Sequence, residues 1–160
     1  MPDGSDIGPR GLIGPNAILQ LVPVLDTRLG VVMRRGLMVA AGAQIPDGKA
    51  LIDQGPAANL HDMLRRTWPE EAPAMLAEAG RGTADYIVAH RIPGAAKALL
   101  PNIPRPLARR ILSRAISSHA WTFAGSGLFR VIGEGPLTYE IAGNPLAHAP
   151  RGSDPVCHWH

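Results

Sequence analysis

Proline and glycine interrupt this chain at short intervals, and their spacing limits the elements that the chain can form. The 160 residues include 16 prolines and 18 glycines. An interior proline removes a backbone hydrogen bond from a helix, and both residue types favour turns. We therefore expect short helices and turns, and neither a long coiled coil nor an all-parallel sheet. With 46% hydrophobic and 18% charged residues, the chain can still bury the core of one globular domain.

Helical periodicity extends to about residue 124, and strand-like alternation follows it. Apolar residues recur at helical spacing in five main stretches, which are 16–29, 31–41, 57–67, about 68–91 and about 106–123. Pro23 is the weak point of the first stretch, because it lies inside it. Two alternating runs, 128–132 and 137–142, are separated by a predicted turn at 133–136. This order predicts an α+β fold, with helices followed by a small antiparallel sheet.

The basic residues of the chain favour an acidic ligand rather than nucleic acid. The net charge is only +3, and the sequence has no RNA-binding aromatic motif and no zinc-finger spacing, so we expect no nucleic-acid partner. Fourteen of the sixteen basic residues are arginine, whose forked donors suit carboxylates and phosphates. Four of them recur at helical spacing, at positions 105, 109, 110 and 114. This basic face could clamp carboxylates, or it could be a solvated helix face.

The run from His119 to Gly127 is the main candidate for a ligand site. It closes the last predicted helix, contains Trp121 and Phe123, and precedes the predicted strands. Only 4% of the residues are aromatic, so aromatic side chains beside glycines at a helix end are a place where a flat apolar ligand could be held. His119 could ligate the metal of a macrocycle, or it could be a core histidine that donates to a backbone carbonyl.

No signature of a resident cofactor is present. Gly125-Ser126-Gly127 leads into a strand, whereas a dinucleotide-binding glycine motif leads into a helix, and there is no Walker loop. The single cysteine, Cys157, excludes an internal disulfide and a self-sufficient iron–sulfur cluster. With His158 and His160 it could supply only part of a zinc site, which normally needs four ligands. We therefore expect no intrinsic metal or cofactor, and no catalytic residue can be assigned.

The N-terminal sequence predicts neither export nor membrane insertion. The first six residues lack the basic and apolar regions of a signal peptide, and no apolar run reaches the ~18 residues of a spanning helix. We expect a cytoplasmic protein without a spanning segment. Residues 1–11 are expected to form a flexible arm, and residues 12–160 the folded domain.

Four segments together resemble the bacteriochlorophyll 4-vinyl reductase family, the J protein of the bacteriochlorophyll synthesis cluster. They are residues 13–18, 82–93, 119–127 and 139–145, and the resemblance covers about residues 12–160. It implies an α+β ligand-binding domain of the 4-vinyl-reductase type, similar to small-molecule sensor domains and vesicle-tethering subunits. Family members usually continue past residues 157–160 into one more helix, so the resemblance implies a domain that lacks this last C-terminal helix.

The resemblance also implies a function in bacteriochlorophyll biosynthesis, on a vinyl-bearing magnesium porphyrin of the protochlorophyllide type. Saturating a vinyl group needs a hydride or electron donor. Because the sequence shows no site for one, we expect a pigment carrier that binds the porphyrin as its ligand or substrate. A true vinyl reductase with an external electron donor is one alternative, and a protein-interaction domain of the magnesium chelatase assembly is another.

The partners and site residues expected are these, with the tetrapyrrole implied by the resemblance and the site residues taken from the aromatic helix end and the arginine face described above. The expected partners are the tetrapyrrole, a magnesium chelatase subunit or a methyltransferase, and a second copy of the chain in a homodimer. A position peripheral to the photosynthetic membrane is an alternative to a freely cytoplasmic one. The expected ligand-binding residues are His119, Trp121, Phe123, Arg110 and Arg114.

Overall fold

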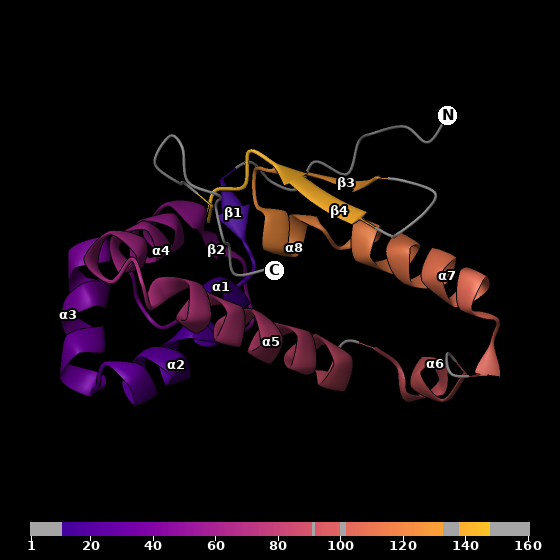
Figure 1. The fold of residues 1–160 in the computed structure, drawn as a ribbon, viewed down its shortest axis with the longest axis horizontal. Coiled ribbons are helices and arrows are strands. Elements are labelled where there is room, and N and C mark those ends of the chain that lie inside the picture. The colour runs from indigo at the N-terminus through magenta and orange to yellow at the C-terminus, as the bar shows by residue number, and fades with distance from the viewer. Residues whose placement is uncertain (1–10, 91, 100–101, 133–137, 148–160) are drawn as a thin grey trace.

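The computed structural model describes residues 11–90, 92–99, 102–132 and 138–147, and the α+β prediction is confirmed. A helical body contains α1 to α5 and a small pair of strands, β1 and β2 (Figure 1). The later elements, α6 to α8 and the β3–β4 hairpin, extend to one side of this body (Figure 1). The candidate site residues all belong to this second part.

The body consists of short helices closed by two very short strands. Its helices are α1 (Asn16–Leu19), α2 (Leu21–Arg28), α3 (Val31–Ala41), α4 (Gln54–Thr67) and α5 (Ala72–His90). Strand β1 (Leu12–Ile13) pairs antiparallel with β2 (Ile52–Asp53). The predicted bounds of α3 are confirmed, because Gly42 adopts a left-handed conformation (φ 68°) that only glycine takes readily and so ends the helix.

The body holds the hydrophobic core of the described residues. Fully buried side chains from its elements meet there, among them Ile13, Leu21, Leu25, Leu60, Leu64 and Leu76. The segment after β4 returns to this core, since Leu146 is also fully buried and its carbonyl oxygen accepts a hydrogen bond from the Arg65 guanidinium. Residues near both ends of the described chain therefore pack in the same core.

The second part contains a long exposed helix and a two-stranded ribbon. Its elements are α6 (Gly94–Leu99), α7 (Arg105–Ser118), α8 (Trp121–Ala124), β3 (Leu128–Ile132) and β4 (Thr138–Ala142). The strands pair antiparallel, with Phe129 opposite Ile141 and Val131 opposite Tyr139, as the alternation predicts. No residue of α7 is buried.

Two predicted helices are each divided in the structure. The stretch 106–123 breaks after Ser118, where the N–H groups of His119 and Ala120 donate to the carbonyls three residues earlier and tighten the turn. The stretch 16–29 breaks at Gln20. Pro23 therefore lies in the first turn of α2, where a missing N–H costs no intrahelical hydrogen bond.

Some predictions concern residues that the structure describes only in part. No helix among the described residues is both long and apolar enough to cross a bilayer. The predicted arm at 1–11 lies outside the described residues except for Gly11, and the predicted turn at 133–136 lies outside them entirely.

Candidate functional site

Helix α8 is held against the body by a backbone contact at Gly14. The Gly14 N–H donates to the carbonyl oxygen of Thr122 at 2.6 Å. A β-carbon at Gly14 would lie 2.4 Å from that oxygen, so no larger residue fits without displacing α8. This close approach fixes Trp121 and Phe123, the aromatic residues of α8, relative to β1.

The loop after α8 is held by the side chain of Gln54, at the start of α4. The Gln54 amide donates to the Ser126 hydroxyl at 2.9 Å, and its oxygen accepts from the Ser126 N–H at 3.0 Å. Gly125 has φ 55°, and a β-carbon there would lie 2.7 Å from the Gln54 oxygen. Gly127 then leads directly into β3, the context expected for a structural turn rather than a dinucleotide loop.

Three aromatic side chains meet where α8 contacts the hairpin, and we call them the aromatic patch: Phe123, Phe129 and Tyr139. Phe123 and Phe129 pack edge to face with ring centroids 5.4 Å apart. Phe129 and Tyr139 stack at 5.5 Å and 27°. Phe123 and Phe129 are half-buried and Tyr139 is 41% exposed, so the patch keeps aromatic surface open to a ligand.

Sequence reasoning identified only Phe123 of this patch. The alternation in the two strands was the signal that could have indicated Phe129 and Tyr139. Residues two apart on a strand share a face, so Phe129 and Val131 lie on one face, and the register places Tyr139 opposite Val131. Trp121, the other predicted aromatic, is half-buried at the start of α8. No ring contact joins Trp121 to the described aromatic side chains of the patch.

His119 is exposed at the end of α7 and is therefore not a core histidine. Its Nδ1 lies 3.0 Å from the carbonyl oxygen of Ala115. The Ser118 hydroxyl lies 3.0 Å from the same Nδ1, so this ring nitrogen is engaged by two neighbours on α7. Contacts at one ring nitrogen fix the orientation of an imidazole, as hydrogen-bond partners do for metal-binding histidines.

Helix α7 has two distinct faces. The inner face is made by residues at i, i+3, i+4 and i+7: Arg109, Leu112, Ser113 and Ile116. It lies toward the hairpin, because the Ser113 hydroxyl is 3.3 Å from the hydroxyl of Tyr139. The outer face has the same spacing and consists of Leu107, Arg110, Ile111 and Arg114.

The faces of α7 separate the predicted arginines from the aromatic patch. Arg110 and Arg114 are exposed on the outer face, while Arg109 is on the inner face, one turn before Ser113. Arg109 thus shares the face of α7 whose Ser113 hydroxyl meets Tyr139. The sequence grouped these arginines together because their spacing alone does not say which face meets the hairpin.

The titratable side chains in the described ranges do not form a metal centre. No group of three or more histidine, cysteine, aspartate or glutamate side chains in those ranges could hold an ion. Cys157, His158 and His160 lie outside the described residues.

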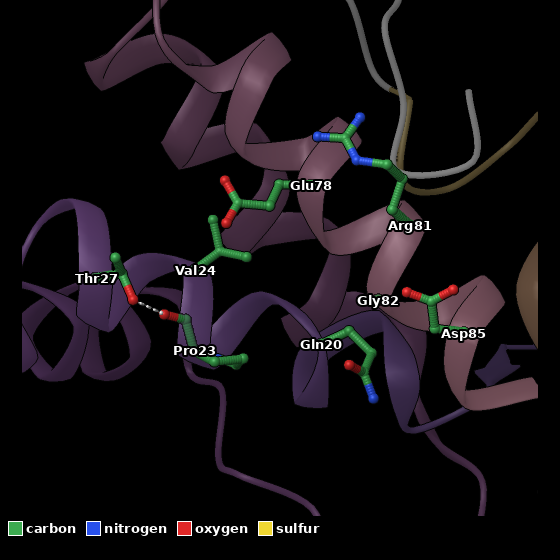
Figure 2. Close-up of a pocket in the computed structure, with 8 residues that line it drawn as sticks. All are labelled: Gln20, Pro23, Val24, Thr27, Glu78, Arg81, Gly82 and Asp85. Carbon is green, nitrogen blue, oxygen red and sulfur yellow. Dashed lines mark hydrogen bonds between the residues drawn. The ribbon is translucent and has the colours of Figure 1, made fainter. Parts of the chain in front are cut away.

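A separate hollow of about 390 Å³ lies between α2 and α5 (Figure 2). Its α5 wall carries Glu78, Arg81 and Asp85. Glu78 is paired with Arg28 of α2 at 2.8 Å. Since Glu78 is already paired with Arg28, the charged side chains of this wall leave no excess of positive charge for a ligand that carries carboxylates.

Taken together, the fold and the site define a small α+β domain with a partly exposed aromatic patch and an exposed histidine at the end of α7. Two relatives align with most of the length of the chain. The bacteriochlorophyll synthase 23 kDa chain of Cereibacter sphaeroides is 47% identical over 149 residues, which cover 92% of this chain and 72% of the relative. The protein of the same name from Rhodobacter capsulatus is 44% identical over 160 residues, with 99% and 74% covered. The chain belongs to the family of the bacteriochlorophyll synthase 23 kDa chain.

The other comparisons add no further relationship. No protein-family model matches the chain, and no solved structure matches it. The name that both relatives share refers to bacteriochlorophyll synthesis and not to the reduction of a vinyl group.

Proposed function

We propose that the protein acts in bacteriochlorophyll biosynthesis as a carrier that holds a vinyl-bearing magnesium porphyrin at the aromatic patch. Membership of the family supports the pathway. The observation that carries the site is the stack of Phe129 on Tyr139, which leaves aromatic surface partly exposed instead of burying it in a core. A flat, apolar macrocycle gains stacking area on such a surface.

The polar groups of the site match the polar groups of the porphyrin. His119 supplies an exposed imidazole, whose unprotonated Nε2 would ligate the magnesium of the pigment. The porphyrin carboxylate requires a cationic donor, and Arg109 is one turn from Ser113 beside Tyr139. Arg110 and Arg114 are exposed on the outer face, and in this proposal they are candidate carboxylate contacts at the rim only. Trp121 is half-buried at the start of α8, two residues before Phe123, and is the remaining aromatic candidate.

A carrier is favoured over a reductase because hydride transfer needs a donor held against the vinyl group, and the sequence shows no motif that would bind one. The glycines that could suggest a nucleotide loop, Gly125 and Gly127, have a packing reason, because a β-carbon would lie 2.7 Å from the Gln54 oxygen at Gly125 and 2.9 Å from the Ala124 carbonyl oxygen at Gly127. A reductase would need its electrons from another protein or from a cofactor bound elsewhere.

The decisive experiment mixes purified protein with a divinyl magnesium porphyrin and records absorbance with and without NADPH. A carrier shifts the Soret band, and NADPH changes nothing further. Loss of the vinyl signature with NADPH would show a reductase instead. No spectral change in either case would leave a protein-interaction domain, and the carrier proposal would be wrong.

Variants then locate the site. Replacing Phe129 with Ala removes the central ring of the patch and should weaken pigment binding about tenfold. His119→Ala should remove the spectral change caused by axial ligation while leaving part of the affinity. Arg109→Gln should weaken binding of a pigment with a free carboxylate but not of its methyl ester, and the Arg110→Gln, Arg114→Gln pair tests the rim in the same way.

A matched control is available in the body. Trp68 is a half-buried aromatic residue that packs against the body core, away from the patch. Trp68→Leu should therefore bind pigment as the parent does, with folding of every variant checked by circular dichroism. If Phe129→Ala and His119→Ala both fold and bind as tightly as the parent, the pigment site lies elsewhere.

A further inference from the structure

The outer face of α7 leaves two apolar side chains about half exposed to water. Leu107 is 49% exposed and Ile111 is 46% exposed. Both lie on the face opposite Ser113, which meets the hairpin. Figure 1 shows α7 at the margin of the molecule, beyond the helical body. Because α7 buries no residue at all, its amphipathic pattern does not serve the core.

The charge on α7 has one sign only. The helix carries four arginines and no acidic residue. On the outer face, Arg110 and Arg114 alternate with Leu107 and Ile111, so each apolar side chain has a guanidinium within one helical turn. A helix with exposed apolar residues on one side, arginines flanking them and low mean hydropathy has the pattern of helices that lie in the plane of a bilayer surface.

We infer that α7 docks the protein on an anionic lipid surface. Leu107 and Ile111 enter the boundary between headgroups and acyl chains. Arg110 and Arg114 extend their charged ends to the lipid phosphates, since long arginine side chains can place their heads at the interface while their stems stay apolar. Each arginine near an anionic surface adds to the attraction, and the four have no acidic neighbour on the helix to offset them.

Charge complementarity favours lipid over a second copy of this chain. A symmetric contact between two outer faces would bring Arg110 and Arg114 of both copies together. Like charges brought together at an interface oppose association, and α7 has no carboxylate that could pair with them. A phospholipid surface offers an apolar layer for the apolar side chains of this face and negative charge for its arginines.

The test is co-sedimentation of the pigment-free protein with vesicles. One set is phosphatidylcholine alone, and the other contains about 30% phosphatidylglycerol to give an anionic surface. The parent protein should bind the anionic vesicles, bind phosphatidylcholine at least about tenfold more weakly, and dissociate in ~1 M salt, where screening is nearly complete. Equal binding to both vesicle types, or no binding to either, would overturn the inference.

Two variants of α7 separate its apolar and charged contributions. Leu107→Ser with Ile111→Ser should weaken binding to anionic vesicles about tenfold or more, because the inserted area is lost. Arg110→Gln with Arg114→Gln should weaken it about thirtyfold. As a control, Val32→Ser with Val39→Ser removes two valines of α3 that are 86% and 80% exposed, and vesicle binding should not change.

The result is independent of the pigment proposal. The Leu107→Ser, Ile111→Ser variant should still shift the Soret band, while Phe129→Ala should still bind vesicles. Unchanged vesicle binding by the Leu107→Ser, Ile111→Ser variant would refute docking through α7. If that variant instead turns a dimer into a monomer in sedimentation, the outer face contacts a second copy and the lipid inference is wrong.

Discussion

The backbone N–H of Gly14 donates to the carbonyl oxygen of Thr122 at 2.6 Å, and this contact joins the first strand of the body to the helix that carries Phe123. The two residues are far apart in the chain. Their approach is close enough that only glycine fits at position 14, since a β-carbon would lie 2.4 Å from the Thr122 oxygen. The aromatic patch therefore depends on a residue that touches no ligand.

Replacing Gly14 with Ala should destabilise the protein by about 1–3 kcal/mol, the usual cost of overpacking a tight site. It should also weaken pigment binding, because α8 must shift. Gly36 in α3 is the matched control, since a β-carbon there meets no atom within 4 Å. Gly36→Ala should stabilise the protein by about 0.5–1 kcal/mol through helix propensity. Urea unfolding of both variants measures the two effects, and equal shifts would contradict the argument.

The two hydrogen bonds between Gln54 and Ser126, which we call the Gln54 clamp, give a second prediction. Gln54→Ala removes two hydrogen bonds at the surface and should lower the free energy of unfolding by about 1–2 kcal/mol. Ser126→Ala removes only the bond to the hydroxyl and should cost less. The double variant should cost less than the sum of the single variants, as expected for coupled residues. Additive losses in chemical denaturation would mean that the clamp does not act as a unit.

The sequence predicted correctly the elements whose ends are marked by a glycine. The end of α3 at Ala41 follows from Gly42, and β3 was recovered with its bounds because alternation begins directly after Gly127. The pair β1–β2 was missed, since two residues per strand are too few to show alternation. The break between α7 and α8 was missed as well, because apolar spacing continues through His119 and the break accompanies docking of α8 on Gly14.

The candidate site was predictable only in part, because it depends on contacts between elements. Periodicity identified α7 as amphipathic, but it does not say what covers the apolar side, and in the structure Ile111 remains 46% exposed. The aromatic patch required the strand register, which places Phe129 between Phe123 and Tyr139. Side-chain type and spacing define candidates, whereas tertiary contacts decide which candidates meet.

Phe123 provides a third prediction, which measures how open the patch is. A fully buried phenylalanine replaced by Ala typically costs about 3–5 kcal/mol. Phe123 is half-buried and packs edge to face on Phe129, so Phe123→Ala should cost about 2 kcal/mol. A thermal or urea unfolding series checks this value. A loss above about 4 kcal/mol would show that the patch is a closed core with no surface for a ligand.

The last prediction concerns acid stability and rests on His61, a fully buried side chain of α4. Its Nε2 donates to the carbonyl oxygen of Ala17 in α1 at 2.9 Å. Burial, with a smaller contribution from the nearby Arg65 charge, lowers the pKa of His61 from 6.5 to about 4. The unfolded chain therefore takes up a proton below pH 6.5, while the folded protein resists protonation until about pH 4. Neutral, buried His61 therefore costs no stability above pH 6.5. Below pH 6.5 the free energy of unfolding decreases, and the loss due to His61 reaches about 3 kcal/mol at pH 4.

His61→Gln isolates this effect, because glutamine can still donate to the Ala17 carbonyl but does not titrate. Urea unfolding between pH 4 and pH 7 should show the parent losing more stability than the variant. The two curves should diverge only below pH 6.5, whatever the offset between the proteins at pH 7. Since the carboxylates are common to both proteins, their contribution cancels in the difference. Parallel curves throughout this range would mean that His61 is protonated in the folded protein at the same pH as in the unfolded chain, and that its burial does not control acid stability.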